Sequence, residues 1–209
     1  MTIRIKICGI THPADAQLAV QAGADLIGLN FVADSPRRLD HDLERAAAIA
    51  NAVAGKAERV GVFRDASHEE IDRVLRRVDL DRLQFHGNES EAAVEEVDLP
   101  VIKAIRGADA EAAAAYPGTI LLLDHPSGQA GSGRAWEWSE AAPLIESGFD
   151  VILAGGLAPE SVGGAIAALG DLLPWGVDVA TGVEGDDHRK DAAKLAAFIQ
   201  AVRKAEAGG

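Results

Sequence analysis

Short apolar runs alternate with longer amphipathic stretches from one end of the chain to the other. Apolar runs bounded by glycine, proline or polar residues are typical of strands buried on both faces. Apolar residues spaced three and four apart are typical of helices that bury one side. The runs predict eight strands, at Ile3–Gly9, Asp25–Phe31, Arg59–Phe63, Arg82–His86, Val101–Ile105, Thr119–Asp124, Asp150–Ala154 and Gly176–Ala180.

A helix is predicted in each gap between these strands. Ser67 and Glu70 form a capping-box pattern ahead of one apolar face. Asp40 is predicted to cap an earlier helix, and Pro159 to occupy the first turn of a later one, where proline is tolerated. The last helix is predicted to bury a face made of Leu195, Phe198, Ile199 and Val202.

The even alternation predicts a single α/β domain over residues 1–209, because no linker or charge block divides the chain. Eight strand–helix pairs of about 26 residues each lie near the lower limit for the (β/α)8, or TIM, barrel. An open doubly wound sheet is the alternative. It is less favoured because no GxGxxG motif follows the first strand. In a barrel the chemistry lies at the C-terminal ends of the strands.

The composition narrows the class of protein. A single cysteine excludes a disulfide framework and a multi-cysteine metal site, and it fits a reducing compartment. A net charge of −13 argues against nucleic-acid binding, which depends on clustered Lys and Arg. No apolar run approaches the length of a membrane span, and the N-terminus has no signal-peptide core. We therefore expect a cytoplasmic protein that binds neither nucleic acid nor membrane.

The single cysteine, Cys8, ends the first strand. Side chains alternate along a strand, so Lys6 and Cys8 share the face opposite Ile5 and Ile7 and are expected to point into the barrel. A thiolate at that rim, favoured by a nearby cation, can act as a base or nucleophile. An inert packed thiol is the alternative. Lys6 is expected to pair with a barrel carboxylate such as Asp178, because the first and last strands adjoin on closure.

A carboxylate, Asp124, closes the apolar sixth strand. Desolvation is expected to raise the pKa of this group and to suit it to act as an acid. The alternative is an aspartate that only caps the following turn. The link from His125 to Glu137 is long for a barrel loop and contains three glycines, which predicts a lid over the site.

Glycine clusters end the seventh and eighth strands, at Gly155-Gly156 and just after Thr181 at Gly182. Glycine lets backbone N–H groups approach an anion, and the loops after the last two strands are the usual phosphate site of this fold. Left-handed turns are the alternative explanation for these glycines. The pair of clusters at these two strands favours a phosphate site.

Three further polar residues are candidates for substrate contacts. Arg37, after the second strand, offers a forked donor to a carboxylate, whereas its neighbour Arg38 is expected at the surface. Gln84 and His86 alternate with apolar residues in the fourth strand, so both are expected to face inward. For His86, a structural interior histidine is the alternative.

Seven segments, taken together and in this order, resemble the phosphoribosylanthranilate isomerase family over almost the whole chain. Any one of them is a weak signal, but seven in order at this spacing are specific. They are residues 6–11 (KICGIT), 28–31 with 35–37 (GLNF, SPR), 61–63 (GVF), 83–87 (LQFHG), 122–124 (LLD), 154–157 (AGGL) and 176–178 with 181–184 (GVD, TGVE).

The resemblance implies a barrel enzyme of tryptophan biosynthesis that needs no metal or organic cofactor. It implies an Amadori rearrangement of N-(5-phosphoribosyl)anthranilate to 1-(2-carboxyphenylamino)-1-deoxyribulose 5-phosphate. It also implies Cys8 as general base, Asp124 as general acid and Arg37 as the residue that holds the anthranilate carboxylate, with the glycine clusters as the phosphate cradle. The residues expected to contact this small phosphorylated substrate are Arg37, Gln84, His86, Gly155, Gly156, Asp178, Thr181 and Gly182.

Some positions depart from the usual pattern of that family, namely Ala130, Ala180 and residues 136–138 and 185–189. Ala180 stands where a serine is frequent, so Thr181 and backbone N–H groups are expected to carry that phosphate contact. None of these departures touches the expected acid or base.

Two other functions remain as alternatives. A related barrel isomerase acts on a histidine-pathway aminoaldose, but that family generally has a carboxylate where this chain has Cys8. A catalytically silent phosphate binder is the second alternative, and the presence of both Cys8 and Asp124 argues against it. The helix faces show no outstanding apolar stripe, so we expect a monomer, with a homodimer as the alternative.

Overall fold

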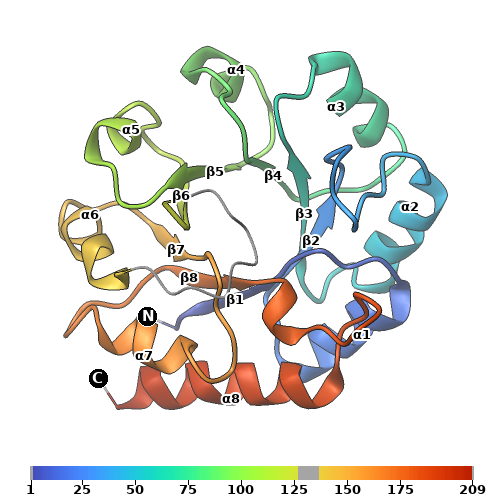
Figure 1. Cartoon of the computed structure of the whole chain (residues 1–209). Helices are drawn as coiled ribbons and strands as arrows, with labels where there is room; N and C mark the ends of the chain where they lie inside the picture. Colours follow the sequence, from blue (N-terminus) through green and yellow to red (C-terminus); the bar gives the residue numbers. More distant parts are fainter. Residues whose placement is uncertain (1, 127–136, 209) are drawn as a thin grey trace.

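Eight parallel strands form a closed barrel in which neighbours in sequence are paired and β1 also pairs with β8. The computed structural model describes residues 2–126 and 137–208. In Figure 1 the strands surround the centre of the molecule and the helices lie outside them. The strands are β1 (Arg4–Ile7), β2 (Leu26–Asn30), β3 (Glu58–Phe63), β4 (Arg82–Phe85), β5 (Val101–Arg106), β6 (Ile120–Asp124), β7 (Val151–Leu153) and β8 (Gly176–Val179).

Helices follow the strands and cover the outside of the barrel. The α-helices are α1 (Pro13–Ala22), α2 (Leu43–Ala52), α3 (His68–Leu75), α4 (Glu91–Glu95), α5 (Ala110–Ala114), α6 (Ala142–Glu146), α7 (Val162–Ala167) and α8 (Ala192–Ala207). The described residues also include two short 3-10 helices, η1 (Trp138–Ala141) and η2 (Thr181–Val183). The closed order confirms the predicted TIM barrel and excludes the open sheet. The predicted strand limits agree with the observed ones to within two residues.

The helix starts were predicted with mixed success. The capping box at Ser67 is present, with the Ser67 hydroxyl and the Glu70 carboxylate each accepting a hydrogen bond from the other's backbone N–H. The prediction for Asp40 was wrong, because Asp42 caps α2 and the Asp40 carboxylate is instead bonded to an arginine side chain. Pro159 does not lie in the first turn of α7. It belongs to a turn that precedes the helix N-cap, Ser161.

Two sets of apolar side chains alternate along the strands. Ile5 and Ile7 are fully buried in the larger set, which packs between the strands and the helices. The smaller set lies on the opposite strand faces, inside the barrel, and contains Leu26, Val60, Ile102, Ala104, Ile120, Leu122, Ile152, Ala154 and Trp175. This alternation leaves the inner face of β1 to polar residues, which is where the predicted site begins.

The N-terminal end of the barrel is closed by Trp175, the residue before β8. The guanidinium groups of Arg4 and Arg82 lie 4.6 and 5.9 Å from the centre of its ring. Both arginines also donate hydrogen bonds to the carboxylate of Glu58. These residues begin β1, β4 and β3, so the cluster lies at the N-terminal end of the barrel, opposite the end where the sequence predicts the site.

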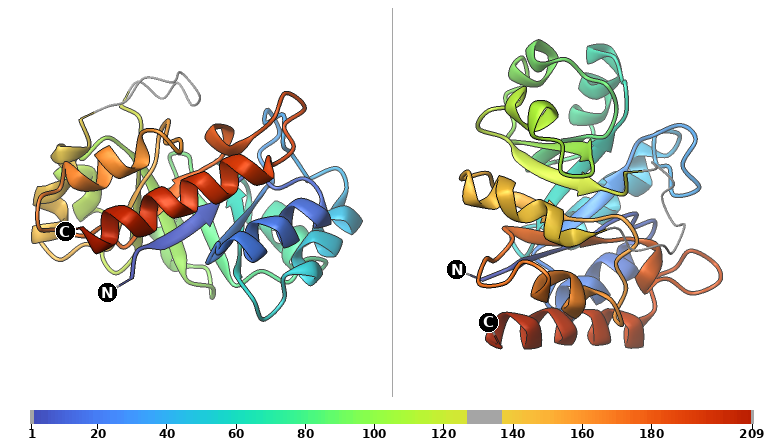
Figure 2. Two further views of the ribbon diagram at one scale, coloured as in Figure 1. Left: turned by 90° about the horizontal axis from the view of Figure 1, so that it is seen from below. Right: turned by 60° about the vertical axis from the view of Figure 1, so that its left-hand side comes forward.

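The last helix, α8, crosses beside α1 and brings the two ends of the described chain together (Figure 2). The backbone N–H of Ile3 donates to the Glu206 carboxylate over 2.6 Å, and Arg203 donates to the Ile3 carbonyl. The predicted apolar face of α8 is buried as expected. No helix in residues 2–126 and 137–208 has the length and apolar character needed to cross a bilayer.

Candidate active site

A cavity of about 530 Å³ opens at the C-terminal ends of the strands. All ten residues that the sequence assigned to the site line this cavity, although they come from six strands or the loops after them. They are Cys8, Arg37, Gln84, His86, Asp124, Gly155, Gly156, Asp178, Thr181 and Gly182. The predicted lid falls mainly on residues 127–136, which lie outside the described residues.

Lys6 lies below Cys8 on the inner face of β1 and is buried, with 1% of its surface exposed. Its Nζ donates a hydrogen bond to Asp178 Oδ1 over 2.6 Å, between residues that are register partners on β1 and β8. This confirms the predicted pair. Burial alone would lower the pKa of Lys6, but the Asp178 carboxylate and the neighbouring Cys8 raise it above its ordinary value. Lys6 is therefore a fixed positive charge under the thiol.

Cys8 is half-buried, and its environment differs from the one expected from the sequence. Burial raises the pKa of the thiol, and the nearby Asp178 raises it further. The ammonium groups of Lys6 and Lys190 act in the opposite direction, but the balance lies above the ordinary value. The thiol form is therefore favoured in the free site, and a thiolate there requires a further change, such as the binding of a substrate.

Gly28 on β2 makes room for this arrangement. A Cβ atom at position 28 would lie 2.8 Å from Cys8 Sγ and 3.2 Å from Lys6 Nζ. Any larger residue would therefore displace the thiol or the ammonium group. The first of the seven segments is thus packed directly against the second, which begins with this glycine.

Asp124 ends β6 and takes part in a short chain of hydrogen bonds with Gln84, which lies on β4, and His86, which directly follows β4. Its Oδ2 lies 3.1 Å from His86 Nε2, and His86 Nδ1 lies 3.1 Å from Gln84 Nε2. An amide nitrogen can only donate, so His86 Nδ1 accepts from Gln84 and Nε2 carries the proton given to Asp124. The side chains of Asp124 and His86 are 16% and 35% exposed, respectively.

The pKa of Asp124 moves in the direction opposite to the prediction. Burial raises it, as expected. The hydrogen bond and charge of His86, together with the His125 backbone N–H, outweigh burial and leave the pKa of Asp124 below its ordinary value. The prediction was wrong because it considered desolvation without the histidine that the fold brings alongside. In the free site, Asp124 is a carboxylate.

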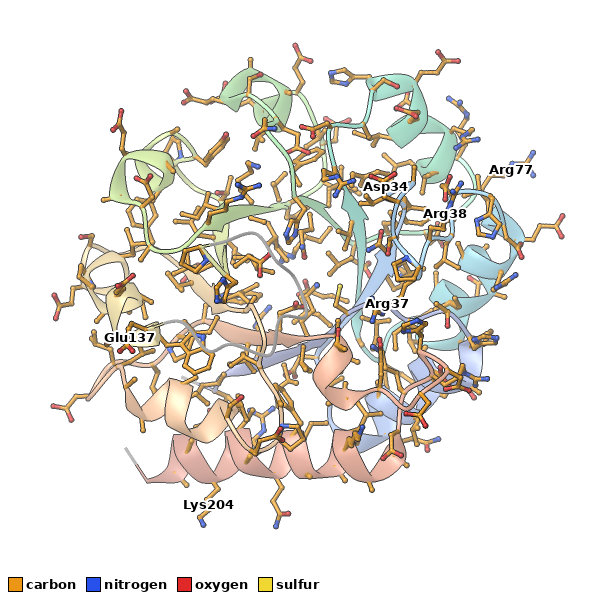
Figure 3. All side chains as sticks on the ribbon, in the orientation of Figure 1. Asp34, Arg37, Arg38, Arg77, Glu137 and Lys204 are labelled. Atoms are coloured by element: carbon orange, nitrogen blue, oxygen red, sulfur yellow. The ribbon has the colours of Figure 1, made fainter. Side chains whose placement is uncertain are left out.

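Arg37 reaches the cavity from the loop after β2, and its orientation is fixed by Glu184. Its Nε and Nη2 donate to Oε1 and Oε2 of Glu184 over 2.7 and 2.5 Å, and Nη2 lies 3.4 Å from Thr181 Oγ1. These bonds and the Glu184 charge raise the pKa of Arg37. Arg38, by contrast, is exposed and bonded to Asp40, as expected for a surface residue (Figure 3).

Glu184 is shared between two cations. Besides Arg37, it accepts a hydrogen bond from Lys190 Nζ, whose side chain is fully buried, over 2.7 Å. Burial lowers the pKa of Lys190, and the two cations lower that of Glu184 in spite of its burial. No role was predicted for either residue from the sequence. Both lie in the irregular loop after β8, where no periodicity indicates which side chains turn inward.

The glycines of the last two loops allow close backbone approaches. Gly155 and Gly156 have φ angles of 80° and 88°, in the left-handed region that favours glycine. A Cβ at Gly182 would lie 2.2 Å from the Leu157 carbonyl oxygen, so the loops after β7 and β8 touch at this point. The two aspartates that follow, Asp186 and Asp187, are exposed, as a neighbouring phosphate site would require.

The donor set of the cavity does not point to a metal. Within the described parts of the chain, no three His, Cys, Asp or Glu side chains are grouped so that they could hold a metal ion. The cavity instead combines a thiol, a carboxylate, a forked cation and glycine-rich loops. Such a set can move protons on a small molecule that carries negative charge at both ends.

Comparison with known proteins identifies the family. The sequence model of the N-(5'phosphoribosyl)anthranilate (PRA) isomerase family matches residues 5–201. The chain belongs to this family. An N-(5'-phosphoribosyl)anthranilate isomerase of Pseudomonas fluorescens is 46% identical over 97% of this chain and 96% of its own.

Solved structures of phosphoribosylanthranilate isomerases share the fold. The enzyme of Thermus thermophilus superposes with a TM-score of 0.85 at 39% identity, covering 97% of this chain and 99% of its own. That of Thermotoga maritima gives 0.89 at 33% identity, covering 97% and 100%. Another phosphoribosylanthranilate isomerase structure, with a TM-score of 0.85 at 33% identity over 97% and 100% of the two chains, is a complex with reduced 1-(o-carboxyphenylamino)-1-deoxyribulose 5-phosphate.

Proposed function

We propose that this chain converts N-(5-phosphoribosyl)anthranilate to 1-(2-carboxyphenylamino)-1-deoxyribulose 5-phosphate by an Amadori rearrangement, with Cys8 as base and Asp124 as acid. One observation carries the proposal: a thiol and a carboxylate line the same cavity, together with a forked arginine and two glycine loops. The substrate has a carboxylate at one end and a phosphate at the other. The cavity offers a separate group for each of these features.

The acid begins the reaction by opening the sugar. Protonated Asp124 gives its proton to the furanose ring oxygen, the C1–O bond breaks, and the C1–N bond becomes a protonated imine. The positive charge then withdraws electrons from C1 and makes the C2 proton acidic. A correctly placed acid contributes about 10²–10⁴-fold to such a step.

The base completes the reaction. Cys8 thiolate removes the C2 proton, and the electron pair moves to form C1=C2 while the imine nitrogen becomes neutral. The resulting enolamine tautomerises, gaining a proton at C1 and losing the O2 proton, to give the ketone. Over the cycle the acid loses one proton and the base gains one, so a single transfer back through solvent restores the enzyme.

The free site contains the number of protons that this cycle needs, but the proton is on the wrong group. The free site favours the Cys8 thiol and the Asp124 carboxylate, whereas catalysis needs the thiolate and the carboxylic acid. Both forms contain one proton. Substrate binding therefore has to favour the relocation of a proton within the site, and no net uptake or release is needed.

Two groups of residues are proposed to bind the ends of the substrate. Arg37 is assigned the anthranilate carboxylate, since its Nη1 takes part in none of its bonds to Glu184 and Thr181. The backbone N–H groups at Gly155, Gly156 and Gly182, with the Thr181 hydroxyl, are assigned the phosphate. Asp178 is assigned an indirect role, because its carboxylate is bonded to Lys6 below the base.

A fluorescence assay of the purified chain tests this function. Phosphoribosylanthranilate should be consumed with loss of its fluorescence, at a rate proportional to enzyme concentration. The histidine-pathway aminoaldose phosphate, supplied in parallel, should be turned over at least tenfold more slowly. If only that compound were turned over, the chain would be the related isomerase. If neither compound were turned over, the catalytically silent phosphate binder would be the remaining alternative.

Arg37→Lys should raise KM for phosphoribosylanthranilate about tenfold, a loss of about 1.4 kcal/mol, with a smaller change in kcat. Lysine keeps the charge and can still bond to Glu184, but it lacks the planar fork that binds a carboxylate through two parallel bonds. Steady-state kinetics would measure the effect. Arg38→Lys, at an exposed neighbour, is the matched control and should leave both constants unchanged; equal effects in the two variants would remove Arg37 from the binding site.

The state of assembly and the location in the cell are also proposals. We propose a cytoplasmic monomer that binds no nucleic acid. A phosphoribosylanthranilate isomerase of Thermotoga maritima is described as dimeric, with monomers obtained from it, so both states occur among relatives. Light scattering of the purified chain at several concentrations would distinguish a monomer of 21.8 kDa from a dimer.

A further inference from the structure

His86 stands between two polar side chains at the wall of the cavity, and both of its ring nitrogens are used. Nδ1 lies 3.1 Å from Gln84 Nε2, and Nε2 lies 3.1 Å from Asp124 Oδ2. Among the described residues these are the two hydrogen-bond partners of the imidazole ring. A histidine held only for packing would not need both nitrogens aligned in this way, with the catalytic carboxylate at one end.

Gln84 is buried, with 2% of its surface exposed, and only its nitrogen is engaged. Its Oε1 has no hydrogen-bond partner within the described parts of the chain. An unpaired buried acceptor costs about 1–3 kcal/mol, so it needs a reason. If the amide turned by half a revolution, Oε1 would face His86 Nδ1 and could accept a proton there. Gln84 can thus pair with either form of the ring: its nitrogen donates to a bare Nδ1, and its oxygen accepts from Nδ1–H.

We propose that His86 and Asp124 act as one acid that shares a single proton, and that Gln84 turns its amide to match the protonation of the imidazole. His86 is then a positioning residue that holds the proton and acts on the substrate through Asp124. The inference rests on the proposed acid role of Asp124. Interacting groups of this kind titrate as a pair, so the acid has the titration of the pair and not that of an isolated carboxyl.

The proton balance of the pair is simple. With both ring nitrogens protonated, Nδ1–H donates to Gln84 Oε1 and Nε2–H donates to the Asp124 carboxylate. The Nε2–H bond then breaks and an O–H bond forms on Asp124, which leaves a neutral imidazole whose Nδ1–H remains bonded to the amide. Asp124 passes this proton to the ring oxygen of the sugar. After product release, solvent returns one proton to Nε2, which restores the starting form of the pair.

Other ionisable groups surround the pair, and several of them are bonded to one another. Arg64 lines the cavity and is paired with Asp34. Lys103 on β5 and Glu89 after β4 are bonded to each other and to Gly87, the residue after His86, and so fix the backbone there. The remaining ionisable groups that line the cavity or border Asp124 are Cys8, Arg37, His125, Asp178 and Arg106, which is the register partner of Asp124 on β5. Gln84 and Asp124 are the groups through which the protonation of His86 can be transmitted.

The pair predicts a specific pH profile for kcat/KM. The working enzyme has a Cys8 thiolate and one proton on the pair. At low pH the free enzyme has the thiol proton as well, so it must lose one proton and kcat/KM rises with pH. Once the pair has lost its own proton, the free and working forms contain equal numbers of protons and kcat/KM is level. Without the imidazole, Asp124 alone loses its proton at lower pH. The level region of the profile should then begin at lower pH, and kcat/KM within it should be smaller than in wild type.

His86→Asn tests this profile. Compared with wild type, the deficit in kcat/KM should be about tenfold larger at pH 8 than at pH 5, because an isolated carboxyl has already lost its proton at pH 5 and the profile of the variant is level from there. His68→Asn, at an exposed histidine on α3, is the matched control and should not change the profile. A deficit of the same size at every pH would indicate a packing role and would overturn the proposal.

A second measurement does not depend on activity, and its main result comes from the wild-type protein. Nitrogen-15 NMR of the wild-type imidazoles at pH 8.5 should find neutral His86 protonated at Nε2, and in Gln84→Met this preference should weaken. Protonation of wild-type His86 at Nδ1 under these conditions would contradict the assigned bonds. If the NMR result is as expected but Asp124→Asn keeps full turnover, the paired site exists and the acid role of Asp124 is what fails.

Discussion

Cys8→Ala is expected to lower kcat for phosphoribosylanthranilate by about 10²–10⁴-fold, the usual contribution of a general base. The substitution removes the only atom proposed to take the C2 proton. It leaves the Lys6–Asp178 bond in place, because that bond does not involve the thiol. KM should change little, since the proposed carboxylate and phosphate contacts come from other loops.

Three controls make the Cys8 prediction sharp. The melting temperature of Cys8→Ala should stay within a few degrees of wild type, because the thiol is only half-buried. Cys8→Ser keeps the size but replaces the thiol with a much weaker acid, so it should be as inactive as the alanine variant. Cys8→Asp supplies a carboxylate base and should recover part of the activity. Wild-type turnover by Cys8→Ala would exclude the thiol as base.

Asp124→Asn is expected to lower kcat by a similar factor, about 10²–10⁴-fold. Asparagine has nearly the same shape, and its amide oxygen can still accept from His86 Nε2, so the arrangement of the cavity wall should persist. What is lost is the acidic proton for the sugar ring oxygen. Single-turnover measurements should therefore find slow ring opening with substrate still bound.

The matched control for Asp124→Asn is the same kind of substitution at a carboxylate outside the cavity. Glu95, an exposed residue on α4, can be changed to glutamine with the same loss of charge. Glu95→Gln should keep full turnover, which separates a local effect from the change in net charge. Activity in Asp124→Asn within threefold of wild type would show that another group, or water, protonates the ring oxygen.

Much of the fold was predictable because it follows from local patterns. Strands buried on both faces are continuous apolar runs, and their alternation with helices leaves few possible topologies. Closure of the barrel then makes β1 and β8 neighbours, which is why the Lys6–Asp178 pair could be predicted from residues at opposite ends of the chain. The helix caps were predicted less accurately. Asp40 and Asp42 have the same side chain, and only the path of the loop decides which of them caps α2.

The residues that line the site could be predicted from the sequence, but their pKa values could not. Position at a strand end is enough to place Cys8 and Asp124 at the cavity. Their pKa values, however, depend on which side chains lie alongside in space. The influence of His86 on Asp124 depends on the relative height of β4 and β6, and Glu184 reaches Arg37 through an irregular loop. Neither relation has a signal in a single sequence.

The bond between Lys6 and Asp178 joins residues 172 positions apart. Cys8 directly follows β1, the first strand of the barrel, yet the partner of the lysine beneath it comes from β8, the last strand to be made. The base site therefore cannot form in any fragment that lacks the last strand. Because the ends also meet at Ile3 and Glu206, a circularly permuted gene that joins them and opens the chain at α4 would be made in a different order but have the same finished site. Its activity during refolding would report barrel closure directly.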